Sequence, residues 1–262
     1  MNLTAEKVER ILVAIDASMR SYDALEAAVE FATLLQTPLT ALFVEDVNLV
    51  KLSELPFAKE LDRSSGVMRP LDSQSVIRAL QLEAQNLQKR LSEESKKRRI
   101  NLSMKIVRGH YIAAAVEMAG KSDIVFVGDS TRLFYERPGR KLDFPNEGKP
   151  GFGHKPVWVF YDGSAVTRRG LALALHLSKE YGLDLVILTA EGCSEAELRG
   201  LLKGVPSAPQ GTRYFVSLAD AENVAATAHR GGCAVLVLPR EGGLSRTPDS
   251  VFAAIKCPRI LV

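Results

Sequence analysis

Cysteine is scarce in this sequence, and its three cysteines lie far from one another. Cys193, Cys233 and Cys257 have neither the spacing of a metal site nor that of a redox motif. The sequence therefore predicts no metal centre and no redox motif, and this pattern fits the reducing environment of the cytoplasm.

Long apolar runs and an excess of one charge are also missing. No apolar run approaches the roughly 18 residues that are needed to cross a bilayer, so we expect no membrane span. The start of the chain, "MNLTAEKVERILVAID", contains acidic residues and no long apolar core, so we expect no signal peptide. The 34 basic and 31 acidic residues leave a net charge of +3, too small for a nucleic-acid-binding protein.

Recognisable catalytic motifs are absent as well. "DAS" and "DGS" follow strand-like runs, but neither is the Gly-x-Ser-x-Gly elbow of hydrolases. The four histidines lie in no metal or nucleophile motif; they are His110, His154, His176 and His229. The sequence names no catalytic residue and no metal ligand, so we favour a protein that is not an enzyme.

What the sequence does have is an internal repeat. The stretch "ILVAIDASMRSYDALEAAVEFATLLQTPLTALFVED", from Ile11, aligns without a gap with "VWVFYDGSAVTRRGLALALHLSKEYGLDLVILTAEG", from Val157. Asp16 then aligns with Asp162. Each copy is typical of a strand, a short polar turn, an amphipathic helix and a second strand. Further along the chain, "GKSDIVFVG" aligns with "GGCAVLVLP".

The first copy is longer than the second, and two features account for the difference. One is a long helix from about Ser73 to Arg99 with an apolar stripe. The other is residues 46–70, which contain prolines and Gly66 and are interpreted as an exposed excursion. This excursion either forms a lid over a ligand crevice or packs on the protein's own surface or on a partner. Because it holds Phe57 and several leucines, we favour packing.

Alternating strands and helices predict an α/β fold, with two doubly wound, Rossmann-like parallel sheets in tandem. We place the two domains at residues 1–150 and 151–262. In such sheets, ligands bind beyond the carboxyl ends of the strands, where the strand order reverses. Asp16 and Asp162 would lie at a candidate crevice there, where either could bond a ribose hydroxyl. Each aspartate also fits a helix N-cap, and the two roles do not exclude each other.

The repeat resembles the universal stress protein family over nearly the whole chain, as two tandem copies. The segments that carry the resemblance are "ILVAIDAS" and "VWVFYDGS" at the first strand, "ALFVED" at the second, "SDIVFVG" at the fourth and "IKCPRILV" at the end. The resemblance implies a five-strand parallel sheet of the adenine nucleotide alpha hydrolase-like type, and often dimers built through the last strand. Many members of the family bind ATP, and others do not.

The resemblance also implies which residues would contact a nucleotide. In ATP-binding members, backbone groups near the end of the first strand and after the second strand contact the base, and the first-strand aspartate lies near the ribose. These positions correspond to Ala14, Val44 and Asp16 in the first copy. In the second copy they correspond to Phe160, Leu188 or its neighbour, and Asp162.

The family's phosphate loop has a glycine, two residues, a glycine, nine residues, and then glycine with Ser or Thr. Glycines let backbone amides at a helix start approach the phosphates closely. In the first copy Gly128 keeps the first position, but Thr131 and Lys141 stand at the next two. In the second copy Pro239 replaces the first glycine, and Gly242 keeps only the second position. We therefore predict that the ATP-binding loops of both copies are degraded.

Two function hypotheses follow from these patterns. The first is a non-catalytic stress-response or regulatory module that does not depend on ATP. The alternative is a protein that binds an adenine nucleotide, ATP or AMP, as a slow ATPase or without turnover. In the alternative, Asp16 and the loop after Gly128 form the site, and Arg132 with its basic neighbours attracts the anion. A solvated basic loop is the simpler interpretation of those arginines.

The first copy also lacks the pattern of a last helix and strand, because "NEGKPG" stands where the second copy has "PRILV". Its fourth strand would then lie near a sheet edge, and exposed edges are usually covered. We predict that the C-terminal strand or another chain covers it. The expected assembly is a homodimer or an intramolecular pseudo-dimer in the cytoplasm, with a protein partner still to be identified and without nucleic acid or membrane.

Overall fold

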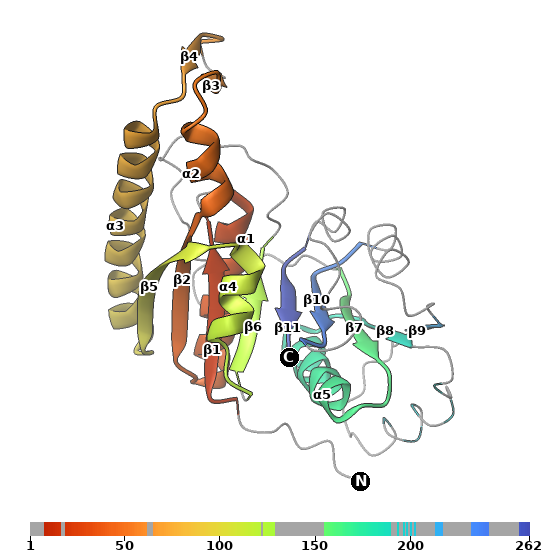
Figure 1. Cartoon of the computed structure of the whole chain (residues 1–262). Helices are drawn as coiled ribbons and strands as arrows, with labels where there is room; N and C mark the ends of the chain where they lie inside the picture. Colours follow the sequence, from red (N-terminus) through yellow and green to blue (C-terminus); the bar gives the residue numbers. More distant parts are fainter. Residues whose placement is uncertain are drawn as a thin grey trace.

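The strands of the chain join into one large sheet with helices on both faces, and a small hairpin projects from one end (Figure 1). The large sheet has nine strands and the hairpin has two, counted over the residues that the computed structural model describes. Those residues are 8–16, 19–61, 65–121, 123–128, 155–189, 193, 196, 198, 200, 202, 213–216, 232–240 and 257–262.

The first half of the chain runs from β1 to β6, and the second half runs from β7 to β11. The elements of the first half are β1 (Arg10–Ile15), α1 (Met19–Leu35), β2 (Leu39–Asp46), α2 (Val47–Ser53), β3 (Lys59–Leu61), β4 (Met68–Pro70), α3 (Ser73–Arg98), β5 (Leu102–Gly109), α4 (Tyr111–Met118) and β6 (Asp123–Val127). Those of the second half are β7 (Val157–Tyr161), α5 (Ala165–Tyr181), β8 (Leu185–Thr189), β9 (Arg213–Val216), β10 (Val235–Leu238) and β11 (Arg259–Leu261).

The strand order of the large sheet is β5-β2-β1-β6-β11-β10-β7-β8-β9. Neighbouring strands are parallel except β6 and β11, which are antiparallel. The predicted α/β class and parallel pairing are therefore confirmed, but the strands form one continuous sheet where we expected two. Because the strand direction reverses between β6 and β11, the carboxyl ends of β1 and β7 point in opposite directions.

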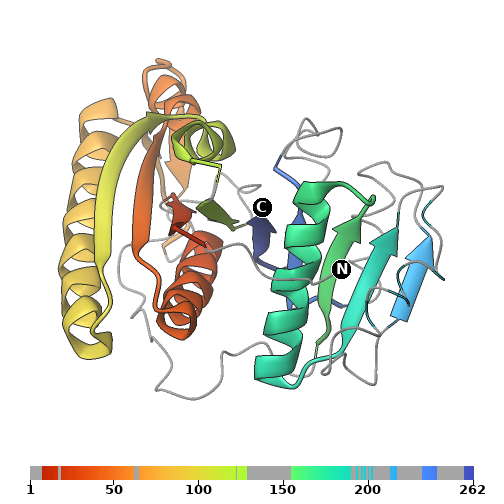
Figure 2. The same ribbon diagram turned by 90° about the horizontal axis from the view of Figure 1, so that it is seen from below.

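Of the helices that the structure describes, α1, α3 and α5 cover one face of the sheet and α4 covers the other (Figures 1 and 2). Strand residues alternate between the faces. Ile11, Val13 and Ile15 pack in one apolar cluster with α1, α3 and α5, and Leu12 and Ala14 pack in another with α4. All of these strand side chains are fully buried, which is the burial expected of a parallel sheet covered on both faces.

The long helix α3 agrees closely with its prediction. It begins after Asp72, whose carboxylate accepts a hydrogen bond from the Ser75 backbone N–H at 2.8 Å, and it ends at Arg99, which has a φ of 55°. Its inward face follows the spacing of three and four residues that buries a helix stripe. The buried apolar residues of this face are Val76, Leu80, Ala84, Leu87 and Leu91.

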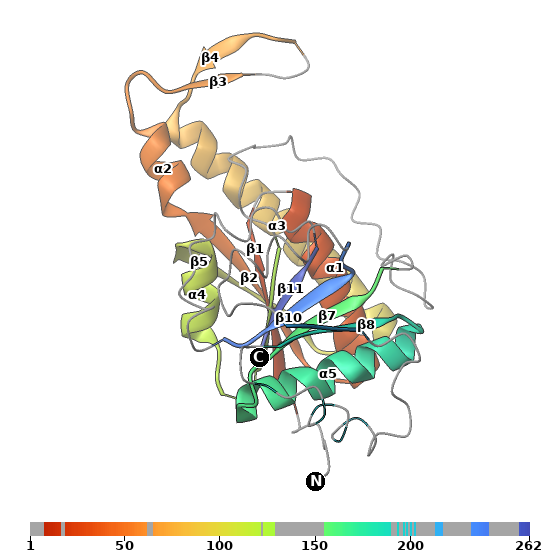
Figure 3. The same cartoon turned by 90° about the vertical axis from the view of Figure 1, so that its right-hand side faces the viewer.

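In the predicted excursion, the described residues after Asp46 form α2 and the β3–β4 hairpin, which projects beyond the start of α3 (Figure 3). Phe57 is 75% exposed, Leu61 58% and Met68 63%. These exposed apolar side chains do not pack on the protein's own surface, so that part of the prediction is wrong for them, whereas packing on a partner stays a prediction.

The two halves meet where β6 pairs with β11, and we call this pair the joint. Phe126 lies opposite Ile260 in its register. The predicted covering of β6 by the C-terminal strand is confirmed. Three arginines of the second half also donate hydrogen bonds to backbone carbonyls of the first: Arg259 to Gly128 at 2.5 Å, Arg240 to Gly120 at 2.8 Å and Arg169 to Lys121 at 2.6 Å.

The cysteines depart from the sequence prediction. Cys233 and Cys257 form a disulfide, with their Cα atoms 5.8 Å apart, and Cys193 lies outside it. The two cysteines are 24 residues apart in sequence, so no short motif reveals the pair. They meet because each precedes one of two parallel neighbours, β10 and β11.

Several predicted features cannot be compared with the structure. The join between the halves (residues 129–154) and the helices expected at 221–230 and 249–256 lie outside the described residues. Among the helices that are described, none is both long enough and apolar enough to cross a membrane.

Candidate functional site

The opposite strand directions of the two halves give two candidate sites instead of one crevice. We call the carboxyl ends of β1, β2 and β6 the first edge, and those of β7, β8 and β10 the second edge. Asp16 and Asp162 belong to different edges, because β6, β11 and β10 lie between their strands and the edges face opposite ways.

At the first edge, the strand order reverses between β1 and β6. α1 leads from β1 to β2 over one face, and α4 leads from β5 to β6 over the other. Such a reversal opens the crevice where ligands bind in doubly wound sheets. Ala14 and Gly128 belong to the two strand ends that flank this point.

Tyr111, the first residue of α4, lies across this reversal point. Its hydroxyl donates a hydrogen bond to the Ala14 carbonyl at 2.7 Å and accepts one from the Gly128 backbone N–H at 3.1 Å. The side chain is only 5% exposed. Two backbone groups that the family resemblance assigns to a nucleotide are therefore already satisfied by the protein's own side chain.

Gly128 is fixed on its other side as well. Its carbonyl accepts a hydrogen bond from the guanidinium of Arg259, a residue of β11 that is 3% exposed. Both the amide and the carbonyl of Gly128 thus have partners within the chain. A buried, charge-assisted hydrogen bond of this kind is stronger than one between neutral groups.

Asp16 and Val44 occupy the rest of the first edge. Val44 is 1% exposed and packs in the same apolar cluster as Tyr111. Asp16 follows β1 directly and is partly exposed. Its charge is one of the smaller influences on Tyr22, whose pKa is raised above its usual range first by burial and then by its hydrogen bond to Glu83.

The two acidic residues at the end of β2 form contacts within the protein. The Asp46 carboxylate accepts a hydrogen bond from the Asn48 backbone N–H at 2.8 Å and so caps α2. Next to it, Glu45 forms an ion pair with Arg108 of β5 at 2.9 Å. These carboxylates support the fold of the edge and add no negative charge free of partners that could bind a metal.

At the second edge, Asp162 stabilises the turn that leads into α5. Its Oδ1 accepts hydrogen bonds from the Ser164 backbone N–H at 2.8 Å and from the Thr167 hydroxyl at 2.6 Å. Ser164 is the N-cap of α5, and its side chain accepts from the Thr167 backbone N–H at 3.2 Å. Partial burial alone would raise the pKa of Asp162, but the hydrogen bonds from Thr167 and Ser164 outweigh it and lower the pKa.

The strand end that corresponds to Gly128 is closed differently at the second edge. Pro239 is buried and has no backbone N–H to offer. The next amide, that of Arg240, donates to the carbonyl of Val262 at 2.8 Å. At the position that corresponds to Ala14, this half has Phe160, which is 4% exposed.

The structure therefore brings Ala14, Asp16, Val44 and Gly128 together at the first edge and places Asp162 at the second. Three other predicted site residues, Thr131, Arg132 and Gly242, lie outside the described residues. In the part of the chain that is described, no three His, Cys, Asp or Glu side chains gather as a metal site would require.

Tyr111 and Arg259 are the residues that the sequence analysis missed. The only sequence signal for Tyr111 was an aromatic residue at the start of a helix that follows a strand ending in glycine. Arg259 gave no signal, because its partner lies 131 positions away in the chain.

Comparisons with known proteins agree with this fold. The sequence profile of the Universal stress protein family matches residues 7–132, which span the first half from before β1 to just beyond β6. The similarity to this family therefore covers the first half of the chain. A comparison with curated proteins gives no match.

One solved structure extends the likeness in fold over both halves. A universal stress protein from Archaeoglobus fulgidus DSM 4304 aligns over 99% of this chain and 97% of its own, with a TM-score of 0.56 and 14% identity. A functionally unknown protein from Pseudomonas aeruginosa PAO1 aligns over 97% of this chain and 92% of its own, with a TM-score of 0.49 and 12% identity. At 14% identity, the first of these likenesses establishes a shared fold and nothing about ligands.

Proposed function

We propose that this protein is a universal stress protein-like regulatory module of the stress response that works without ATP and without catalysis. In this proposal the first half has the fold of the family, and the first and second edges stabilise the fold and bind no nucleotide. The proposal also takes the phosphate loops of both halves to be degraded, as their glycine pattern predicts.

The observation that carries this proposal is the position of Tyr111. Its hydroxyl satisfies the Ala14 carbonyl and the Gly128 amide at the reversal point of the strand order. A ligand that used either group would have to displace a buried side chain and break a hydrogen bond. Buried polar groups left without partners cost about 1–3 kcal/mol each, and the Tyr111 hydroxyl removes that cost for both groups.

We also propose that the second half is a divergent second copy of the same domain, and that the two copies form an intramolecular pseudo-dimer. Each half places its first strand between its second and its fourth. The antiparallel β6–β11 pair joins them in the way that two chains pair across an edge. This arrangement leaves β5 and β9 as the outer strands, where a homodimer or a protein partner would add.

The alternative function is adenine-nucleotide binding at the first edge. It is favoured by one observation: Ala14, Asp16, Val44 and Gly128 all lie at that edge, inside the segment that matches the family. In this alternative, ATP or AMP displaces Tyr111, and Asp16 contacts the ribose. The expected location for either function is the cytoplasm.

Isothermal titration of the purified protein with ATP and with AMP distinguishes the two functions. We expect no binding heat up to about 1 mM nucleotide, the concentration at which a weak site of −4 kcal/mol is half filled. A dissociation constant in the micromolar range would overturn the proposal. In that event Asp16→Ala tests the alternative, because unchanged binding by this variant would remove Asp16 from the site.

A further inference from the structure

The disulfide lies at a position where it can control the joint between the halves. Cys233 precedes β10 and Cys257 precedes β11, and they are 8% and 6% exposed. Both sulfur-bearing side chains belong to the apolar cluster that contains Tyr111 and Val127 of the first edge. The disulfide is therefore on the same side of the sheet as α4, next to the first half's candidate site.

The strand that the disulfide anchors is short. β11 has three residues and lies between β10 and β6. It pairs with β10 over these three residues, and the residues that flank it add hydrogen bonds from Leu236 N–H to the Pro258 carbonyl and from Val262 N–H to the Leu238 carbonyl, each 3.0 Å long. A strand of this length contributes few hydrogen bonds, so a covalent link at its start adds a large share of its anchoring.

We propose that Cys233 and Cys257 form a reversible redox site whose disulfide locks β11 into the joint. In the oxidising step the two protein thiols lose two protons and two electrons, and the protein S–S bond forms. The oxidant is a low-molecular-weight disulfide, whose own S–S bond breaks to give two small thiols. Reduction by such thiols reverses the step, and cytoplasmic disulfides are usually of this transient, redox-sensing kind.

The disulfide affects the first edge through Arg259. This residue follows Cys257 by two positions, and its guanidinium donates to the Gly128 carbonyl. The Gly128 amide in turn donates to Tyr111. When the disulfide is reduced, β11 detaches more often, so the end of β6 loses both its antiparallel neighbour and the Arg259 hydrogen bond. The redox state of the second half therefore sets the local stability of the first edge.

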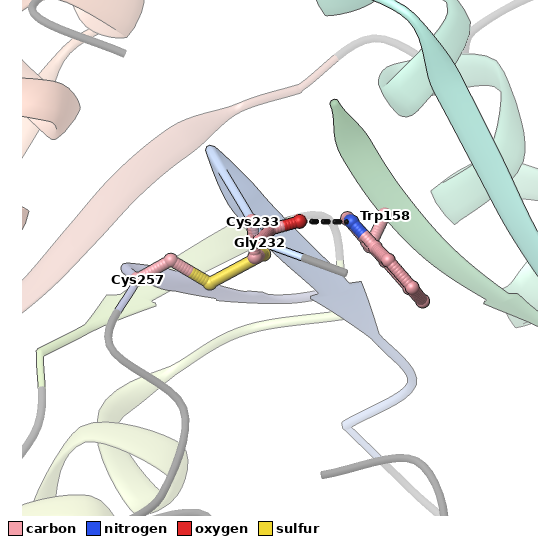
Figure 4. The surroundings of a disulfide bond; sticks show 4 residues. All are labelled: Trp158, Gly232, Cys233 and Cys257. Carbon is pink, nitrogen blue, oxygen red and sulfur yellow. Dashed lines mark hydrogen bonds between the residues drawn. A yellow bond between two sulfur atoms is a disulfide. The ribbon is translucent and has the colours of Figure 1, made fainter. Parts of the chain in front are cut away.

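A spectroscopic reporter lies beside this site (Figure 4). Trp158, the only tryptophan of the chain, donates its Nε1–H to the carbonyl of Gly232 at 2.8 Å, and Gly232 immediately precedes Cys233. A disulfide close to an excited indole quenches its emission. Reduction of the Cys233–Cys257 disulfide should therefore raise the fluorescence of Trp158, and no added label is needed.

The first experiment is a redox titration of the full chain in mixtures of reduced and oxidised glutathione. Cysteines are counted by alkylation under denaturing conditions and mass spectrometry. The number of alkylated cysteines should change from three to one as the mixture becomes oxidising, and Trp158 fluorescence should fall at the same midpoint. Cys193→Ser is the matched control and should keep that midpoint, whereas Cys233→Ser and Cys257→Ser should abolish the transition.

The second experiment measures hydrogen exchange of residues 259–261 and 123–128 in oxidised and reduced wild-type protein. Reduction should speed exchange in both segments roughly 100-fold, the order expected when a loop closure of this size is released. Exchange in β2 and β8, which do not touch β11, should stay unchanged. Because reductant acts on the wild-type chain, this test does not depend on whether the serine variants fold.

Two results would overturn the inference. One is a protein that keeps three alkylated cysteines in every glutathione mixture. The other is a disulfide that forms but leaves the exchange of residues 123–128 unchanged. Neither measurement uses a nucleotide, so failure here is distinguishable from failure of the proposed function.

Discussion

The two edges of the sheet are built from aligned segments, yet they are closed by different means. At the first edge a side chain, Tyr111, occupies the reversal point and satisfies the Gly128 amide. At the second edge the backbone itself is changed, because Pro239 has no amide and the Arg240 amide pairs with Val262. The first closure depends on one phenol, whereas the second is part of the main chain and its hydrogen bonds.

This difference indicates at which edge a single substitution could expose backbone groups to a ligand. Removing one side chain exposes a carbonyl and an amide at the first edge. At the second edge a donor requires replacement of Pro239 itself, next to the Arg240 amide that is bonded to Val262, the residue after β11. The substitutions below test this contrast in order of decreasing effect.

The largest effect is expected for Tyr111→Ala. Truncation of this buried ring should lower the free energy of unfolding by about 4 kcal/mol, because it leaves a cavity and two unsatisfied backbone groups. It should also raise the affinity of the first edge for AMP at least about tenfold, a gain of about 1.4 kcal/mol. Urea unfolding and isothermal titration measure the two changes.

Two control variants refine this prediction. Tyr111→Phe keeps the ring and removes only the hydroxyl, so it should cost about 1–2 kcal/mol. Phe160→Ala opens the aligned position of the second edge and should bring no gain in AMP affinity, because Pro239 offers no N–H. Equal gains at both edges would contradict the contrast.

A second difference between the halves lies at the other end of β6. Asp123 is 3% exposed, pairs with Arg10 at 2.5 Å and accepts a hydrogen bond from the Gly120 backbone N–H at 2.8 Å. The aligned residues of the second half are Ala234 and Pro156. Asp123→Ala copies the second half, and it should lower the free energy of unfolding by about 3 kcal/mol because Arg10 keeps a partly buried charge without its partner.

The double variant Arg10→Met with Asp123→Ala provides the control. It removes both charges, so it should be more stable than Asp123→Ala alone. Urea unfolding of both variants, done side by side, checks the order. A double variant that is less stable than the single one would show that the ion pair itself contributes little.

A smaller effect is expected at the start of α5. Ser164→Ala removes the acceptor for the Thr167 backbone N–H and should cost about 1 kcal/mol. Ser164→Asn keeps a capping oxygen and should restore most of that loss. Thermal unfolding followed by circular dichroism measures both, and an unchanged melting temperature for Ser164→Ala would mean that Asp162 alone holds the turn.

The smallest effect concerns pH and a position where the two aligned helices differ, Glu30 of α1 and the exposed His176 of α5. Burial, opposed by the charge of Arg98 and assisted by that of Glu26, raises the pKa of Glu30 from 4.5 to about 7. Below pH 4.5 the group is protonated in both states. Between 4.5 and about 7 only the unfolded chain loses its proton, so the folded protein becomes less stable as the pH rises.

We expect this loss to be about 1 kcal/mol or less, because the side chain is partly exposed and water screens its charge. Glu30→Gln should flatten the slope of stability against pH in that range. The measurement is urea unfolding at half-unit pH steps. A slope of the opposite sign in the wild type would contradict the raised pKa.

Much of the fold could be predicted from local patterns in the sequence. The α3 stripe from Val76 to Leu91, the apolar strands and the covering of β6 by the C-terminal strand all follow from periodicity and from the alignment of the two copies. The exposure of the β3–β4 hairpin could not be predicted this way, because exposed apolar residues such as Leu61 and Met68 look like core residues when only their type is known.

For the candidate site, too, some features could be predicted from the sequence and others could not. The sequence alone determined which residues stand at strand ends, since Ala14, Asp16 and Gly128 follow from the run of apolar strands and the polar turns after them. Only the tertiary structure decided that the two edges face opposite ways, that Tyr111 and Arg259 satisfy Gly128, and that Cys233 meets Cys257. The opposite directions of the edges and the contact of Arg259 with Gly128 depend on the direction in which β11 pairs with β6. The sequence pattern predicts that a strand covers β6, but it carries no information about the direction of that strand or about which side chains then meet.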